Sequence, residues 1–194
     1  DLTKDEYKGL YQLHNLGGGT AKTVFASIIS RYQDPDGDLG ISDEGWEIAA
    51  KFLGNAHNIA DGEDAVGSVI DGTYPMDEHW ASGVLTEQKD RDYKFQIMTP
   101  DIGEPYVVES LAISAGTKKY DTCVAFLNWL GSSDVQLDWS NNYGTIPCQK
   151  EALDQVSDDI KELMETLKPQ DLDWSFIAEN VDAWVEKAEL EYVQ

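Results

Sequence analysis

Basic residues are scarce in this chain of 194 residues. It has 14 lysines and arginines against 37 aspartates and glutamates, which gives a formal net charge of −23 at pH 7. A surface with that charge repels phosphate, so we expect no nucleic-acid partner. The apolar fraction of 41% and the charged fraction of 26% are ordinary for a globular protein. The length allows one domain or two small lobes.

Long hydrophobic runs and cysteine motifs are also absent from the sequence. No apolar stretch approaches the roughly 20 residues that a membrane-spanning helix requires. The two cysteines, Cys123 and Cys148, lack metal-ligand spacing, and whether they pair or stay free is open. His14 and His57 are interpreted as packing or surface residues rather than ligands. No nucleophile elbow, H-E-x-x-H or C-x-x-C motif is found, so several hydrolase and redox signatures are missing.

The stretch Leu13–Phe25 has the pattern of a short strand, a glycine turn and the first turn of a helix. Three glycines let the backbone turn sharply and approach a ligand closely. Thr20 is the expected N-cap, and Lys22 would add a positive charge. Because a helix N-terminus offers unpaired N–H groups, we predict that Gly18, Gly19 and Thr20 bind an anionic group. A plain strand-to-helix turn without a ligand is the alternative.

The same stretch is a near miss for the phosphate loop of NTPases. Lys22 and Thr23 stand where that motif has its lysine and hydroxyl residue, but Leu16 and Ala21 replace its two glycines. No acidic residue at the end of an apolar strand is evident as a magnesium partner. The sequence therefore disfavours an NTPase.

An acidic turn in the first quarter of the chain resembles a calcium loop of the EF-hand type. Asp34, Asp36 and Asp38 fall at positions 1, 3 and 5 of that loop. Leu39 stands where the loop needs glycine, and Gly45 stands where it needs a bidentate glutamate. The three aspartates are therefore a candidate Ca²⁺ site, with a solvated acidic turn as the alternative.

Two further acidic clusters lie in the middle of the chain. The run Asp77–Trp80 combines carboxylates with a histidine and a tryptophan, which can hold sugar hydroxyls, an amine or a metal ion. Asp101, Glu104 and Glu109 bracket a Pro-Tyr pair, and paired carboxylates can hydrolyse glycosides. Nothing in the sequence fixes the separation of these carboxylates, so an ordinary charged loop rim remains the alternative.

Apolar periodicity predicts strands alternating with helices, and hence an α/β fold. Thr86–Asp92 is expected to be an exposed loop. The expected elements are a strand and helix within 11–32, a helix at 44–55, a short helix from Ala60 followed by a strand through 66–70, strands at 93–98 and 107–113, helices capped by Asp121, Ser132 or Ser133, and Ser157, and a final helix at 174–192.

Three later segments resemble the late part of extracellular solute-binding proteins of ABC importers. They are Gly103–Thr117, Ala125–Gln136 and Tyr143–Pro147. The pattern is similar to the branch that handles ferric iron, phosphonates and sugar phosphates. The resemblance extends to the turn Gly17–Thr20 and to the segment Gly72–Trp80, so it covers nearly the whole chain.

This resemblance implies a type II periplasmic-binding-protein-like α/β fold with two lobes around a cleft. The chain would supply the second lobe plus C-terminal helices, with most of the first lobe missing ahead of Asp1. The implied parts are a lead-in at 1–10, a ligand-binding lobe at 11–105, a crossover segment of the other lobe at 106–147, and C-terminal helices at 148–194 that pack on the ligand-binding lobe. The crossover segment would be exposed, exchanged between copies or covered by dimerisation.

The resemblance also implies a function. The protein would be an extracellular, cell-surface or periplasmic lipoprotein that is not an enzyme. It would capture a small polar or anionic solute in the interlobe cleft and deliver it to the membrane permease of an ABC transporter. No cofactor is implied beyond the candidate Ca²⁺. A calcium-dependent extracellular module and a carboxylate-based hydrolase are the alternatives.

The ligand-binding residues follow from the same resemblance. The glycine turn would hold the anionic group, and the Asp77–Trp80 run would line the opposite wall. Iron-binding members use adjacent tyrosines that are absent from that run, so we expect a polar organic or phosphorylated ligand rather than ferric iron. The implied binding residues are Gly18, Gly19, Thr20, Asp77, His79, Trp80, and Asp101 or Glu104 for hydroxyls or an amine.

Overall fold

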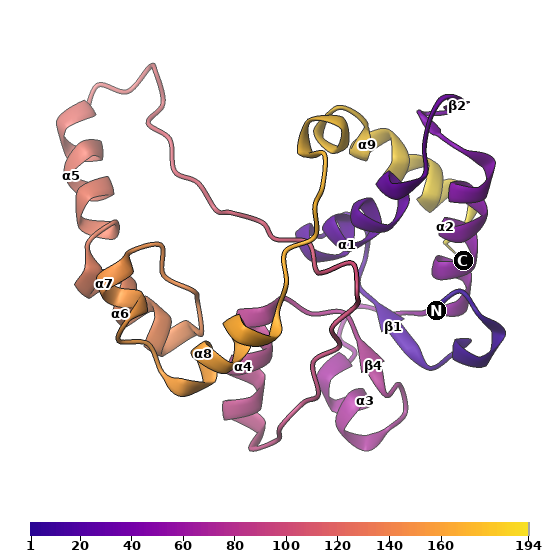
Figure 1. Ribbon diagram of the computed structural model, residues 1–194, viewed down its shortest axis with the longest axis horizontal. Helices are drawn as coiled ribbons and strands as arrows, with labels where there is room; N and C mark the ends of the chain where they lie inside the picture. The colour runs from indigo at the N-terminus through magenta and orange to yellow at the C-terminus, as the bar shows by residue number, and fades with distance from the viewer. Residues whose placement is uncertain (194) are drawn as a thin grey trace. The chain divides into compact units, whose positions relative to one another are not determined.

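The structure, a computed structural model, describes residues 1–193 (Figure 1). It forms two compact units. Unit 1 joins the first 79 residues to the C-terminal stretch that starts at Asp171, and unit 2 is Trp80–Gln170. Each unit is described by itself.

Unit 1 is built around a small parallel sheet. In the described residues, its three strands have the order β3-β1-β4. Gln12 at the centre of β1 lies opposite His57 on one side and Asp77 on the other. All of β1 is buried, as expected for a central strand covered on both faces. The strands are β1 (Tyr11–Leu13), β3 (His57–Asn58) and β4 (Met76–Asp77).

Three helices of unit 1 pack against one another beside the sheet (Figure 1). They are α1 (Gly19–Ile29), α2 (Asp43–Asn55) and α9 (Trp174–Glu191). Each buries residues spaced three or four apart, which is the spacing of one helix face. The fully buried members of their shared core include Phe25, Ile29, Ala49, Leu53, Trp184 and Ala188. Burial of this face is what holds the C-terminal helix to the first part of the chain.

The remaining elements of unit 1 are short. Helix α3 (Ala65–Asp71) lies between β3 and β4 in the sequence, and its N-cap Asp64 accepts a 3.0 Å hydrogen bond from the Gly67 amide. Helices α2 and α9 begin in the same way, at Ser42 and Asp173. The other elements are the 3₁₀ helices η1 (Asp5–Tyr7) and η2 (Ser30–Tyr32), the strand β2 (Gln33–Asp38), and α3 (Ala65–Asp71).

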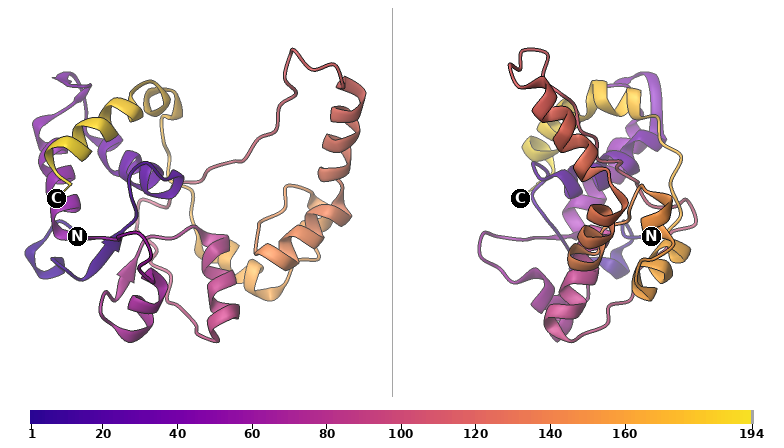
Figure 2. Two further views of the ribbon diagram at one scale, coloured as in Figure 1. Left: turned by 180° about the vertical axis from the view of Figure 1, so that it is seen from behind. Right: turned by 90° about the vertical axis from the view of Figure 1, so that its left-hand side faces the viewer.

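Unit 2 is helical in its regular parts. A long segment without helix or strand precedes α5 (Figure 2). Val107 and Val108 in that segment are 62% and 75% exposed. The helices are α4 (Ala81–Arg91), α5 (Tyr120–Leu130), α6 (Ser133–Tyr143), α7 (Lys150–Leu153) and α8 (Asp158–Thr166).

Several predicted elements are wrong. Residues 93–98 and 107–113 are not strands, because a strand needs a neighbouring backbone and no described strand pairs with them. Val66, Val69 and Ile70 belong to α3, and their spacing of three and one is helical rather than alternating. The segment expected as an exposed loop at 86–92 lies almost entirely in α4, and α5 begins one residue before its predicted cap.

Candidate functional site

The carboxyl ends of β1 and β4 meet at one edge of the sheet in unit 1 (Figure 1). The two strands are parallel with Gln12 opposite Asp77, so the residues that follow them emerge side by side. His14 follows β1, and Glu78 and His79 follow β4. The His14 amide donates a 3.2 Å hydrogen bond to Glu78 Oε1 across this edge. Ligands of open α/β sheets bind outside the carboxyl ends of strands, which makes this edge the candidate site.

Three side chains converge at this edge. His14, Asp77 and His79 each offer one metal-ligand atom, and these atoms lie within 4.8 Å of one another. His79 Nδ1 is 3.6 Å from Asp77 Oδ2, and the two side chains are 14% and 8% exposed. The rings of His14 and His79 have centroids 6.3 Å apart. The interpretation of His14 as a packing residue is therefore incomplete, because the register of β1 against β4 places it in this cluster.

Glu78 adds a second carboxyl group to the same edge. Burial raises the pKa of the Glu78 carboxyl to about 7, and the charge of Asp77 acts in the same direction. The hydrogen bond from the His14 amide opposes this shift. The Glu78 carboxyl therefore stays protonated to a higher pH than the carboxyl of an exposed glutamate, which lowers the negative charge at this edge.

Helix α1 follows β1 in the sequence, after a turn that the Asn15 side chain stabilises. The Asn15 side-chain oxygen accepts a 2.7 Å hydrogen bond from the Gly17 amide. Gly18 is the N-cap and Gly19 the first helical residue, so the prediction of Thr20 as N-cap is wrong. No side-chain hydrogen bond caps this helix in the described residues, and the Asn15 side-chain oxygen bonds to the Gly17 amide before it.

The first amides of α1 have no acceptor within the helix, whereas the Gly18 amide before them donates a 2.9 Å hydrogen bond to the Asn15 carbonyl. The Lys22 amide donates a 3.0 Å hydrogen bond to Gly18 O, which begins the helical pattern. The amides of Gly19 and Thr20 come before it, at positions that have no acceptor within a helix. Gly18 and Gly19 are exposed. The Lys22 ammonium forms an ion pair with Asp182 at 3.0 Å, so its positive charge is already partly neutralised.

The other predicted binding residues lie in unit 2. Trp80 is the N-cap of α4 and is 53% exposed, and Asp101 is exposed. Glu104 Oε2 accepts a 2.9 Å hydrogen bond from the Lys168 amide, and the two residues are also joined through their backbones. This carboxylate thus stabilises the pairing of 104 with 168–170. That these three residues contact the same ligand as Asp77 and His79 stays a prediction.

Comparison with known proteins now decides the family. Residues 1–168 match the family described as "Bacterial extracellular solute-binding protein". The chain belongs to this family. It is 34% identical over 194 residues to "Probable ABC transporter periplasmic-binding protein y4fP" of Sinorhizobium fredii. That match covers all of this chain and 54% of the relative, so the chain spans about half the length of the curated relative.

The fold of the chain agrees with the family. It superimposes on the structure titled "Ferric binding protein from Campylobacter jejuni" with a TM-score of 0.76 and 21% sequence identity. The match covers 98% of this chain and 60% of that one. The predicted α/β fold of the periplasmic-binding-protein type is therefore confirmed. The described part of the chain contains no helix long and apolar enough to cross a bilayer.

The acidic turn of the chain is held by local hydrogen bonds. Asp34 Oδ1 accepts a 3.0 Å hydrogen bond from the Asp36 amide, and the Asp38 carbonyl accepts one of 3.0 Å from the Trp46 indole. Within residues 1–193, the group with metal-ligand geometry is the His14 cluster, which does not include these aspartates. The Ca²⁺ site at Asp34, Asp36 and Asp38 stays a prediction.

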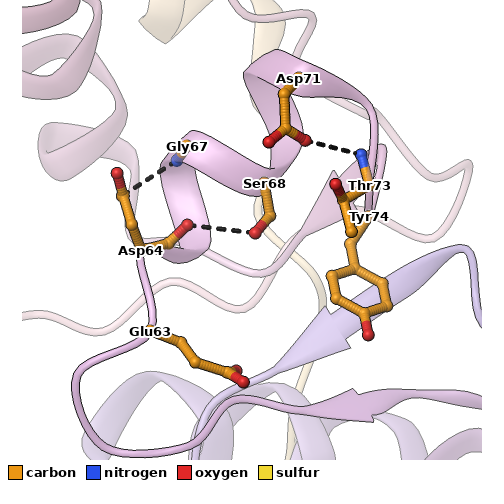
Figure 3. A pocket seen from close by; sticks show the side chains of 7 residues that line it. All are labelled: Glu63, Asp64, Gly67, Ser68, Asp71, Thr73 and Tyr74. Carbon is orange, nitrogen blue, oxygen red and sulfur yellow. Dashed lines mark hydrogen bonds between the residues drawn. The ribbon is translucent and has the colours of Figure 1, made fainter.

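An acidic hollow of about 370 Å³ lies beside α3, away from the predicted binding residues (Figure 3). Its carboxylates bond to the local backbone. Asp64 accepts from the Gly67 amide at 3.0 Å, and Asp71 accepts from the Thr73 amide at 2.8 Å. These bonds cap α3 and close the turn that follows it, so local structure accounts for the positions of both carboxylates. It is lined by Glu63, Asp64, Gly67, Ser68, Asp71, Thr73 and Tyr74.

Proposed function

We propose that this protein is the solute-binding component of an ABC importer and binds a small polar or anionic solute at the carboxyl ends of β1 and β4. The observation that carries the proposal is the position of His14, Asp77 and His79 together at the carboxyl ends of β1 and β4. Family membership supports solute binding in general, and the residues of this edge supply the chemistry. The protein would act by binding and release, without a chemical step.

The edge offers two kinds of contact. The amides at the start of α1 suit a phosphate, phosphonate or carboxylate group, because they combine free N–H donors with the positive end of the helix dipole. Asp77 and His79 suit hydroxyl, amine or metal contacts. A solute with an anionic end and a polar end would use both.

The finer parts of the proposal concern the whole protein. We place the solute in an interlobe cleft of the whole protein, and Trp80, Asp101 and Glu104 stay predicted binding residues. The protein would work outside the cytoplasm, at the cell surface or in the periplasm, and deliver its solute to a membrane permease. The dimer through the exposed segment around Val107 and Val108 stays a prediction, which sedimentation tests.

A thermal-shift screen of the full-length protein tests the proposal. The panel contains sugar phosphates, phosphonates, polyamines and ferric salts. A solute that binds the folded state raises the melting temperature by mass action, by an amount that grows with its concentration. The absence of a shift across the panel contradicts the proposal. Turnover of glycosides or phosphate esters in parallel assays would favour the carboxylate-based hydrolase instead.

A further inference from the structure

We propose that His14, Asp77 and His79 bind a divalent transition-metal ion, leaving at least one coordination position for a donor from solution. Binding itself needs only these side chains. That the metal ion is the transported solute, or its centre, rests on the proposed function.

The first support is the arrangement of the three donors. Their candidate ligand atoms lie within 4.8 Å of one another. Ligand atoms around a tetrahedral zinc ion lie about 3.4 Å apart, given bonds of about 2.0–2.1 Å. Small rotations of the side chains therefore bring all three into a single coordination sphere. The separation of 3.6 Å between His79 Nδ1 and Asp77 Oδ2 already approaches that value.

The second support is the state of the donor atoms. His14 Nε2 and Asp77 Oδ1 are buried, and neither has a hydrogen-bond partner within residues 1–193. A buried polar atom without a partner costs free energy, commonly about 1–3 kcal/mol. A metal ion would satisfy both atoms at once. The Asp77 side chain is 8% exposed, so water reaches it poorly.

The donor types select the kind of metal. Two imidazoles and one carboxylate suit Zn²⁺, Fe²⁺, Co²⁺ and similar ions, whereas Ca²⁺ prefers oxygen donors alone. Three protein ligands are typical of sites that keep a position open, as in catalytic zinc centres. In a binding protein, the open position would accept water or an anionic donor. The chemistry thus distinguishes this site from the candidate Ca²⁺ turn.

All three ligands belong to unit 1 and follow strands that are neighbours in one sheet. The register of Gln12 against Asp77 fixes the backbone at both strand ends. The site is therefore complete within one unit, and its affinity for the metal ion should not depend on residues of unit 2.

Calorimetric titration of the full chain with Zn²⁺, after treatment with a chelator, tests the inference. We expect one zinc ion per chain, and no heat from Ca²⁺ at this site. His14→Gln, Asp77→Asn and His79→Gln should each weaken binding by at least about 100-fold, since each removes a ligand. The chain has three histidines, so His57→Gln is the matched control and should bind as the unchanged protein does. Asp61→Asn is the control for the carboxylate change.

A second readout covers variants that fail to fold. Co²⁺ added to the unchanged protein should give visible absorption bands of a nitrogen- and oxygen-ligated ion, and Zn²⁺ should displace them. Absence of such bands and of zinc heat overturns the inference. Equal binding by His14→Gln and His57→Gln, with both variants folded by circular dichroism, also overturns it.

The inference and the proposed function fail separately. If zinc does not bind but an organic anion raises the melting temperature, the metal site is wrong and the proposed function stands. Zinc binding together with uptake into vesicles that contain the permease supports both. Zinc binding without uptake supports the metal site and contradicts the assignment of the metal ion as solute.

Discussion

Gln12 Nε2 donates a 2.6 Å hydrogen bond to the backbone carbonyl oxygen of Ala65. Gln12 is only 1% exposed, so this bond satisfies a polar side chain inside the core. It joins β1 to the start of α3, and β1 carries His14 two residues further on. The geometry of the candidate site thus depends on a buried polar contact outside it.

We expect Gln12→Met to lower the free energy of unfolding by about 1–3 kcal/mol. The change keeps the size of the side chain but leaves the Ala65 carbonyl without its buried donor. Gln33→Met is the control, because Gln33 is exposed and its replacement should change stability by about 0.5 kcal/mol or less. Urea unfolding followed by circular dichroism measures both. Equal effects in the two variants would contradict the role given to Gln12.

Trp184 holds the C-terminal helix to the acidic turn. It is fully buried, and its indole N–H donates a 2.9 Å hydrogen bond to the Leu39 carbonyl. Trp184→Phe should lower the free energy of unfolding by about 2–4 kcal/mol, through a cavity and a lost hydrogen bond. Trp174→Phe should cost much less, because Trp174 is 43% exposed. Denaturant titration of the two variants compares them, and a larger loss at Trp174 would refute this account.

The anion contact at α1 is tested by Gly19→Pro. Proline is tolerated at the first helical position, and Gly18 already has φ −76° and ψ 147°, which proline accepts in its preceding residue. The change removes one amide donor and should weaken binding of an anionic solute about tenfold while stability is kept. Gly19→Ala retains the amide, and its added Cβ meets nothing within 4 Å. Calorimetry should find normal affinity for Gly19→Ala, and normal affinity for Gly19→Pro would exclude the contact.

Glu63 supplies a pH-dependent part of the stability. The hydrogen bond from His57 at 2.8 Å, and then that from the Ala60 amide, lower the pKa of Glu63 below its ordinary 4.5. A lowered pKa stabilises the fold above pH 4.5, and this stabilisation is lost as pH falls through the lowered value. The unfolding free energies of the unchanged protein and Glu63→Gln should therefore converge in acid. A constant difference between the two proteins across the pH series would contradict this role of Glu63.

Local patterns were sufficient to predict the elements that frame the site. The strand and glycine turn before α1, the apolar face of α2 and the long α9 all follow from periodicity within one segment. Resemblance to solute-binding proteins supplied the fold, which the structure confirms. The N-cap of α1 was misplaced by two residues, because Asn15 rather than Thr20 supplies the side chain that orders the turn.

The cluster itself depended on information that one segment does not contain. The composition of the run Asp77–Trp80 predicts Asp77 and His79, whereas His14 is 63 residues away from Asp77 in the sequence and joins them only through the β1–β4 register. The same reasoning explains the errors at 93–98 and 107–113. A strand requires a partner, and alternation within a segment cannot show whether one is present.

A crystal structure of the full protein with the solute found in the thermal-shift screen tests the central claim most directly. The account predicts electron density for the solute at the carboxyl ends of β1 and β4, within contact of Asp77 or His79 and of the first amides of α1. Density bound elsewhere, for example in the hollow beside α3, with this edge free of solute, would contradict it.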